Sequence, residues 1–283
     1  MRNAYGMNRE ILEMRLLLEA VYSLSGFDFR EYNQQSILRR VQHRMRINNI
    51  PTISRLTETI IYEEQLLNQL LNDFSINVTE MFRDPTFFHT FRQEVVPQLR
   101  QLDKIRIWHA GCATGEEVYS MAILLQEEGL LDRTVLYATD MNQSVLIKAQ
   151  TGAFPIQKMQ AYTKNYFLAG GKEAFSQYYK TDAEYVYFQP CLRENIIFAQ
   201  HNLVTDHSFQ EFDVIICRNV LIYFTHKLQH DVHELFYESL APNGFLALGD
   251  KETLQFTPIA SKYQTVHQKE RIYQKKIEHN HIF

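Results

Sequence analysis

The fold of this 283-residue chain is decided by the stretch Lys104–Glu117, which reads KIRIWHAGCATGEE. Apolar and polar residues alternate over residues 104–108 as in a β-strand, a glycine-containing turn follows over residues 111–115, and helical spacing begins at Glu116. A strand, a glycine loop and a helix in this order are typical of a parallel sheet that helices cover on both faces.

Further segments continue this alternation of strands and helices. Apolar runs of strand length recur at Thr134–Ala138, Phe212–Cys217 and Gly244–Gly249. A helical pattern spans about residues 226–240. Residues 174–201 are rich in Tyr, Phe and Val at strand length, which predicts a small antiparallel insertion that leads into a sheet strand. The predicted fold class is α/β, with a Rossmann-like sheet and an inserted β-subdomain.

The chain before the deciding stretch is predicted to be all-helical. Apolar residues recur at helical spacing over residues 8–25, 35–47 and 53–73, and the last segment has room for one or two helices. Gly26 stands where the first helix would stop. We therefore expect a helical N-terminal domain over residues 1–100 and a sheet domain over residues 101–283, with the β-subdomain at about residues 155–200.

Composition narrows the classes of protein that fit. The net charge of −4 argues against a surface built throughout for nucleic acid, although it permits a local basic patch. Apolar runs are far shorter than the roughly 18 residues of a membrane helix, and charged residues interrupt the N-terminal apolar stretch, which argues against a signal peptide. The three cysteines lack the spacing of a disulfide framework or a zinc site. We expect a monomeric cytoplasmic protein without membrane insertion or bound metal.

The glycine loop lies where such a sheet binds a nucleoside-containing ligand, beyond the carboxyl end of the first strand. A dinucleotide site has G-x-G-x-x-G and a helix N-terminus that is open to phosphate. Here three residues separate Gly111 from Gly115, and Glu116 and Glu117 follow at once. These carboxylates favour a phosphate-free, cationic cofactor such as S-adenosylmethionine, and Asp140 after the second strand would accept hydrogen bonds from its ribose. By itself the motif also fits a plain tight turn before a helix.

Five motifs follow one another along the chain. They are NVTEMFRD at Asn77–Asp84, GEEVYS at Gly115–Ser120, ATD at Ala138–Asp140, Asn202–Leu203, and FDVIICRNVLIYF at Phe212–Phe224. Their sequence and order resemble those of the CheR-type chemotaxis receptor methyltransferases, which use S-adenosylmethionine to methylate glutamate side chains on the cytoplasmic helices of receptors. The resemblance implies an S-adenosylmethionine-dependent methyltransferase sheet with an inserted β-subdomain, a helical N-terminal domain, and S-adenosylhomocysteine as product.

Carried over residue by residue, the resemblance implies two groups of functional side chains. The first group contacts the cofactor and comprises Asn77, Thr79, Arg83, Gly111, Glu117, Asp140, Asn202, Leu203, Arg218 and Asn219. The second group, Arg83 and Tyr223, faces the reacting centre. Because a glutamate carboxylate is already ionised at neutral pH, we expect Arg83 and Tyr223 to position the acceptor and not to transfer protons.

These residues also have simpler structural interpretations. Asn77 and Thr79 could cap a helix that begins near residue 80. Arg83 could form a surface ion pair with an adjacent acid, and Tyr223 could be an ordinary core residue. His109, beside the glycine loop, is better interpreted as a packed histidine at a strand end than as a general base.

A cluster of arginines marks the predicted helix at residues 35–47. It comprises Arg39, Arg40, Arg44 and Arg46, with His43, which lie away from the apolar set of that helix, and Arg30 precedes them. We expect this face to dock acidic helices, which the resemblance implies are the methylated helices of a receptor. A merely solvated face is the alternative. Nucleic acid is not expected as a partner, because Arg218–Tyr223 lacks the Pro-Pro of base-amino methyltransferases and no aromatic series accompanies the arginines.

Two segments depart from the family pattern. Leu168–Lys172 is shorter than the glycine-punctuated loop with which some relatives capture a pentapeptide of the receptor tail, so we expect no such capture. Gly249–Leu254, GDKETL, replaces a more usual Gly-His-Ser-Glu segment and indicates a divergent branch. Two alternatives to the receptor methyltransferase stay open: a non-catalytic, cofactor-binding signalling adaptor, and a methyltransferase with a nucleic-acid substrate.

Overall fold

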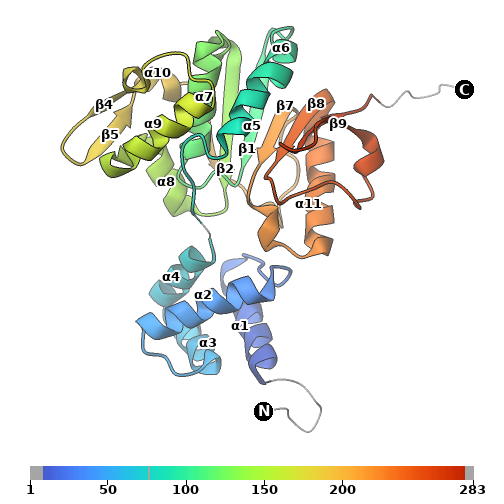
Figure 1. Cartoon of the computed structure of the whole chain (residues 1–283). Coiled ribbons are helices and arrows are strands. Elements are labelled where there is room, and N and C mark those ends of the chain that lie inside the picture. The colour runs from blue at the N-terminus through green and yellow to red at the C-terminus, as the bar shows by residue number, and fades with distance from the viewer. Residues whose placement is uncertain (1–8, 76, 278–283) are drawn as a thin grey trace, which may run out of the picture. The chain divides into compact units, whose positions relative to one another are not determined.

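The computed structural model describes residues 9–75 and 77–277 and forms two compact units (Figure 1). The helical unit comprises the residues up to 75 together with 204–206 and 223–231. The sheet unit comprises the remaining described residues, beginning at Asn77. The sequence predicted a helical domain that extends to residue 100, whereas the two units divide near residue 76.

The segment 77–100 belongs to the sheet unit although much of it is helical, as predicted. It contains α5 (Pro85–Thr90), a π-helical turn (Phe91–Val95) and α6 (Val96–Leu99). Phe87, Phe88 and Phe91 are fully buried in the same apolar cluster as the side chains of β1 and of the helix that follows it. Burial of large aromatic side chains is strongly favourable, at about 25 cal/mol per Å² of apolar surface, and this assigns the segment to the sheet.

Four amphipathic helices form most of the helical unit. They are α1 (Arg9–Ser25), α2 (Gln34–Ile47), α3 (Ile53–Tyr62) and α4 (Glu64–Phe74). The side chains of Asn33 and Thr52 cap α2 and α3 by accepting hydrogen bonds from backbone N–H groups of the first turn. The predicted helical region 53–73 is divided into two helices because Glu63 has an extended backbone conformation.

The segment 223–231 folds with the helical unit although it is distant in sequence. The N–H of Asn33 donates to the carbonyl oxygen of Tyr223 over 2.7 Å. The rings of Tyr32 and Phe224 meet edge to face, with their centroids 4.8 Å apart. These contacts make Tyr223 part of the helical unit.

The sheet unit is built on a seven-stranded sheet in the order β6-β2-β1-β7-β8-β10-β9. In that order the strands are Ile196–Gln200, Thr134–Asp140, Ile105–Ala110, Phe212–Cys217, Leu240–Leu248, Ile272–Lys275 and Tyr263–His267. The first five are parallel, and β10 and β9 are antiparallel. The parallel core confirms the α/β prediction, and the β9–β10 hairpin adds an edge that was not predicted.

The predicted insertion forms a separate antiparallel sheet in the order β3-β5-β4. Its strands are Ala153–Pro155, Tyr185–Phe188 and Tyr179–Thr181. Burial alternates along β5, with Val186 and Phe188 buried and Tyr185 and Tyr187 exposed, as expected for a sheet with one covered face. The end of the predicted segment, residues 196–200, joins the main sheet as β6.

The remaining helices connect the strands (Figure 1). They are α7 (Glu116–Glu127), α8 (Gln143–Thr151), α9 (Met159–Leu168), α10 (Pro190–Arg193) and α11 (His226–Ser239), with short 3-10 turns at Leu131–Arg133, Ile156–Lys158, Phe175–Tyr178, Leu221–Tyr223 and Ala260–Lys262. No helix within residues 9–75 and 77–277 has the length and apolar character needed to cross a membrane.

Candidate cofactor and substrate site

The predicted cofactor residues gather at one edge of the main sheet, where the parallel strands end. Gly111 follows β1, Asp140 ends β2, Asn202 follows β6 and Arg218 follows β7. Neighbouring strands are in register at this edge, because Ala110 on β1 lies opposite Thr139 and Asp140 lies opposite Gln200. The carboxyl ends of parallel strands are the usual ligand site of such a sheet.

The glycine loop is tied to the end of β2. Gly111 and Gly115 have φ values of +76° and +91°, a region that glycine enters without steric cost. The N–H of Gly111 donates to the carbonyl oxygen of Thr139 over 2.8 Å, and the N–H of Ala113 donates to Oδ2 of Asp140 over 3.0 Å. The loop conformation is therefore set by hydrogen bonds and not by helix capping alone.

Asp140 is placed to accept hydrogen bonds from a ligand. Asp140 is 8% exposed. Its Oδ2 accepts a hydrogen bond from the backbone N–H of Ala113, and its Oδ1 accepts one from the backbone N–H of Asn142. Burial raises the pKa of Asp140 above its ordinary value, while these hydrogen bonds favour the ionised form. The backbone N–H of Met141 also lowers the pKa of Asp140, so about one of the roughly four acceptor positions of the carboxylate remains for a ribose hydroxyl.

Asn202 and Leu203 follow β6 beside Asp140. The N–H of His201 donates to the carbonyl oxygen of Asp140 over 3.2 Å, which joins the two segments. Asn202 is 7% exposed and Leu203 is partly exposed. The edge therefore presents a buried amide and an apolar side chain next to the carboxylate, as a nucleoside would require.

The two glutamates at the start of α7 have different environments. Glu116 is only 2% exposed and accepts a hydrogen bond from the hydroxyl of Tyr162, and burial raises its pKa. The side chain of Glu117 is 18% exposed, and its two oxygens lie 3.2 Å from His109 Nδ1 and 3.0 Å from Arg218 Nη1. Burial opposes ionisation of Glu117, but the contacts with His109 and Arg218 outweigh it and lower its pKa. Of the two glutamates, Glu117 is the one whose contacts stabilise the ionised form against burial.

Arg218 is engaged by protein groups on several sides. Its side chain is 2% exposed, and the guanidinium lies 4.2 Å from the centroid of the Phe87 ring. It donates to Glu117 over 3.0 Å, to Asp84 over 2.7 Å and to the carbonyl oxygen of Arg83 over 3.3 Å. Its guanidinium thus clamps the 83–84 turn to the start of α7, and the cofactor contact that the resemblance implies for Arg218 stays a prediction.

The segment Asn77–Asp84 precedes a helix but does not belong to one. The next helix begins only at Pro85, so Asn77 and Thr79 do not cap a helix near residue 80. The N–H of Phe82, a residue with a φ of +50°, donates to Oγ of Ser120 over 2.9 Å. A left-handed conformation at a bulky residue is unfavourable, so this contact helps to hold the turn.

Arg83 remains partly exposed on this turn. Its Nη1 donates to the carbonyl oxygen of Val78 over 3.2 Å, while the adjacent Asp84 pairs with Arg218. The interpretation of Arg83 as an ion-pair partner of Asp84 is therefore not what the structure shows. A guanidinium has five N–H donors, and the described contact with Val78 uses one of them.

Glu252 is a site residue that sequence reasoning did not select. It is 4% exposed, and its carboxylate accepts hydrogen bonds from the backbone N–H groups of Asn219, Val220, Leu221 and Gly249. It lies in the GDKETL segment, which the sequence showed only as a departure from the family pattern. An acid shortly after a buried strand was the available signal, and it did not distinguish Glu252 from Asp250.

The predicted catalytic pair is divided between the units. Arg83 belongs to the sheet unit, and Tyr223 belongs to the helical unit. Tyr223 is partly exposed and is therefore not a fully buried core residue. His109, by contrast, is 1% exposed and held by Glu117, in agreement with its interpretation as a packed histidine.

The four arginines predicted for docking fall into two pairs. Arg40 donates to the carbonyl oxygen of Asp73 over 3.0 Å, and Arg44 forms an ion pair with the carboxylate of Asp73 at 2.7 Å. These two arginines therefore hold α2 against α4. Arg39 and Arg46 are exposed and line a shallow hollow together with both helices. The face available for docking is narrower than the sequence indicated.

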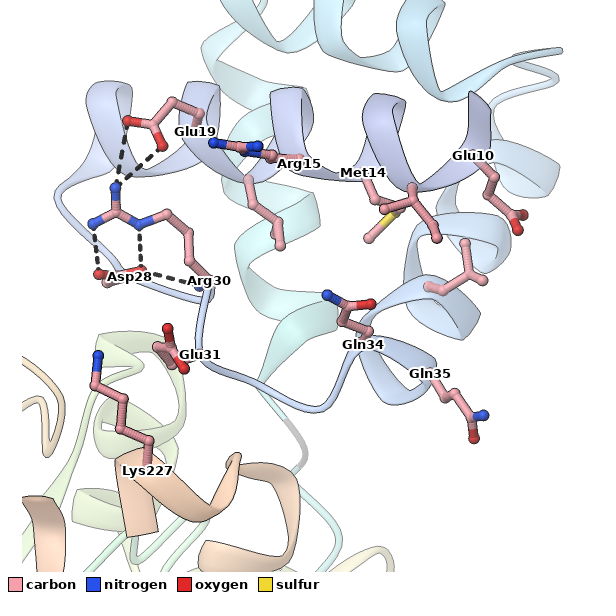
Figure 2. A pocket seen from close by; sticks show the side chains of 13 residues that line it. Glu10, Met14, Arg15, Glu19, Asp28, Arg30, Glu31, Gln34, Gln35 and Lys227 are labelled. Atoms are coloured by element: carbon pink, nitrogen blue, oxygen red, sulfur yellow. Dashed lines mark hydrogen bonds and ion pairs between the residues drawn. The ribbon is translucent and has the colours of Figure 1, made fainter. Parts of the chain in front are cut away.

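A second hollow, of about 680 Å³, lies between α1, the following turn and the start of α2 (Figure 2). Arg30 spans part of it and pairs with Glu19 at 3.1 Å and with Asp28 at 2.8 Å. Glu31 and Lys227 add one charge of each sign to the lining. Of the described residues, four acids line this hollow, whereas Asp73 is the one acid that lines the hollow around Arg39, so the second hollow is a poorer match for an acidic helix.

Comparison with known proteins gives two family matches. The CheR methyltransferase all-alpha domain matches residues 12–75, and the CheR methyltransferase SAM binding domain matches residues 77–272. The border between the two matches coincides with the border between the two units.

Two relatives agree with these family matches. Cher3 of Pseudomonas putida, provisionally designated a methyltransferase, is 46% identical over 93% of this chain and 97% of its own length. A chemotaxis protein methyltransferase of Listeria monocytogenes is 28% identical over 81% of this chain and 85% of its own length. Among solved structures, the N-methyltransferase NodS of Bradyrhizobium japonicum, in complex with S-adenosylhomocysteine, has a TM-score of 0.33 and 15% identity over 60% of this chain and 62% of its own.

The geometry fits the cofactor of the matched family. The carboxylate of Asp140, the charge of Glu117 and the glycine loop suit a ligand with a ribose hydroxyl and a positive charge and without phosphate. The chain belongs to the CheR methyltransferase family and has both its all-alpha domain and its S-adenosylmethionine-binding domain.

Proposed function

We propose that this protein methylates glutamate side chains on the cytoplasmic helices of a chemoreceptor or a related signalling protein. The products are glutamate methyl esters and S-adenosylhomocysteine. Family membership and the names of chemotaxis relatives support this proposal. The single observation that carries it furthest is the clamp of Arg218, which holds the turn of Arg83 at the cofactor edge of the sheet.

Different residues of the chain would bind different parts of the cofactor. Asp140 would accept hydrogen bonds from the ribose, and Asn202 and Leu203 would contact the base. Glu117 would offer its charge to the cationic part, and Asn219 would add polar contacts. The bound cofactor supplies an activated methyl group on a sulfonium. The carboxylates of Asp140 and Glu117 explain why the net charge at this edge suits a cation.

The acceptor needs positioning more than activation. A glutamate with a reference pKa of about 4.3 is ionised at neutral pH, so no general base is required. Orientation and exclusion of water can contribute several kcal/mol to such a reaction. Arg83 is partly exposed, and Arg218 holds its backbone by donating to its carbonyl oxygen. The described contact with Val78 uses one N–H of the Arg83 guanidinium, so further N–H groups are placed to bind a carboxylate. Tyr223 would add a phenol hydroxyl to the same task.

The helical unit supplies a surface for the substrate. Arg39, His43 and Arg46 are exposed on α2. Positive charge on a helix face accelerates encounter with an acidic helix and favours one register over others. We propose this narrower set as the docking face and assign Arg40 and Arg44 to the stability of the unit.

Transfer of a labelled methyl group tests the proposal. Wild-type protein is incubated with labelled S-adenosylmethionine and a cytoplasmic receptor fragment, and the expected product is label that mild alkali releases, because methyl esters hydrolyse under these conditions. Arg83→Ala should reduce turnover by at least about 100-fold at saturating cofactor, as expected for loss of a positioning contact. Arg55→Ala is the matched control, because Arg55 is an exposed arginine of the helical unit.

The possible results separate the candidate functions. Alkali-labile label that depends on Arg83 supports glutamate methylation. Intact binding of S-adenosylhomocysteine without transfer to any receptor fraction would support the non-catalytic adaptor. Alkali-stable label in nucleic acid would support the nucleic-acid alternative.

A further inference from the structure

We propose that Glu252 is a positioning residue that fixes the segment Asn219–Leu221 at the cofactor site by binding its backbone N–H groups. The segment follows Arg218 at the end of β7, and Asn219 is a proposed cofactor contact. The inference rests on that part of the proposed function and not on the identity of the methyl acceptor.

Four N–H groups converge on the carboxylate of Glu252. Oε1 accepts from Val220 over 2.8 Å and from Leu221 over 2.7 Å. Oε2 accepts from Asn219 over 3.0 Å and from Gly249 over 2.6 Å. Each oxygen thus accepts two donors, which fills the acceptor capacity of a carboxylate. Successive backbone N–H groups that point to one place form a nest that favours an anion.

The conformation of the segment depends on this contact. Asn219 has a φ of +61°, a left-handed conformation that is unfavourable for most residues but tolerated by asparagine. Three successive N–H groups, of residues 219–221, donate to this one carboxylate. A buried donor without a partner is costly, so Glu252 makes this turn possible.

Close packing connects the nest to the glycine loop. A Cβ atom added to Gly111 would lie 2.6 Å from Cγ2 of Val220, so the position of Val220 determines the space that the glycine loop has. At Gly249 an added Cβ would lie 2.7 Å from Oε2 of Glu252 and 2.9 Å from the nitrogen of Asn219. Both glycines are therefore required by the approach of the same segment, and displacement of Val220 would disturb the cofactor loop.

An isosteric change distinguishes charge and acceptor capacity from packing. Glu252→Gln preserves volume but replaces one oxygen by an NH₂ group, which then faces two N–H donors. Loss of two hydrogen bonds and donor-to-donor repulsion should loosen residues 219–221. Asp250→Asn is the matched control, because Asp250 is an exposed acid of the same segment and loses the same charge without touching the nest.

Calorimetric titration with S-adenosylhomocysteine is the primary measurement, and it needs no methyl acceptor. We expect Glu252→Gln to weaken binding by at least about tenfold and Asp250→Asn to change it by less than about twofold. Glu252→Asp, which keeps both oxygens and the charge, should recover part of the loss. Far-ultraviolet circular dichroism and the fluorescence of Trp108, the one tryptophan of the chain, report whether the fold is kept.

Equal affinity of wild type and a folded Glu252→Gln would overturn the inference, and so would an equal loss in Asp250→Asn. If Glu252→Gln does not fold, amide hydrogen exchange of the wild type decides. Slow exchange at Asn219, Val220 and Leu221 supports the nest, whereas exchange as fast as in exposed loops refutes it. Absence of methyl transfer to receptors, with these results intact, would refute the proposed substrate and leave the role of Glu252 standing.

Discussion

Replacement of Arg218 by methionine should destabilise the sheet unit by about 3 kcal/mol. The side chain of Arg218 is 2% exposed and that of Glu117 is 18% exposed, so the substitution leaves a mostly buried carboxylate without its guanidinium. Removal of one partner from a buried pair costs about 3–5 kcal/mol, and the remaining contact with His109 places the expected value at the lower end. Asp84 is 41% exposed, so loss of that pair adds at most about 1 kcal/mol.

Urea unfolding followed by Trp108 fluorescence measures this effect. Trp108 is fully buried on β1 and contacts Phe212 and Phe236, so its signal reports the sheet unit. With an m value of about 3 kcal/mol per M, the unfolding midpoint should fall by about 1 M. Arg106→Met is the control, because Arg106 is exposed on the same strand and should shift the midpoint by less than about 0.2 M.

A second substitution tests the physical reason for the loss. If the unpaired charge of Glu117 is the cause, Glu117→Gln in the Arg218→Met background should restore stability, because the isolated charge is then removed. A double variant that is destabilised by the sum of the two single effects would refute this reasoning. So would a midpoint shift in Arg218→Met no larger than that of the control.

Three further predictions concern other parts of the molecule. Contacts with Tyr166, Lys172 and Arg92 lower the pKa of Glu127 although burial opposes this, so the stabilisation from its carboxylate is present above about pH 4.5 and is lost as pH falls through the folded pKa. The difference in free energy of unfolding between wild type and Glu127→Gln should be about 2–3 kcal/mol at pH 7 and should shrink below about pH 4. A difference that stays constant with pH would contradict this prediction. Arg44→Ala should destabilise the helical unit by about 2 kcal/mol and lower its melting temperature in scanning calorimetry. Arg39→Ala should leave the melting temperature unchanged and raise only the KM for an acidic receptor helix. Equal shifts of the melting temperature would argue against the division of the four arginines into a structural pair and an exposed pair. Gly111→Ala should weaken S-adenosylhomocysteine binding at least about tenfold in calorimetry, because of its φ of +76° and the contact with Val220, and wild-type affinity would contradict the proposed loop geometry.

Strands and helices of the sheet unit were predictable because the spacing of apolar residues within a short segment indicates which residues are buried. Parallel strands covered on both faces are mostly apolar, and β2 and β7 contain short apolar runs, while β1 shows the alternation of a strand. The loop that starts at Gly111 was predictable because a sharp turn between a strand and a helix requires glycine. The β9–β10 hairpin was not predicted, because its strands, Tyr263–His267 and Ile272–Lys275, are short and mixed in polarity.

The division into units was harder to predict from the sequence. Helical segments lie on both sides of the segment 77–84, and nothing in their pattern says which core a helix joins. Phe87, Phe88 and Phe91 join the core of the sheet unit because its apolar surface accommodates them. Likewise, the strand-like contact of Tyr32 with Phe224 joins residues that are far apart in the chain, and no local signal indicates it.

By itself the sequence determined the parallel α/β fold, the order of the motifs and the chemical character of the cofactor, because periodicity and motif spacing are properties of short segments. Only the tertiary structure decided which charged side chains are paired with other groups inside the protein. Arg44 meets Asp73, Arg218 meets Glu117 and Asp84, and Glu252 meets the N–H groups of residues 219–221. Each pair joins segments brought together only by packing, and a buried charge keeps whichever partner packing provides.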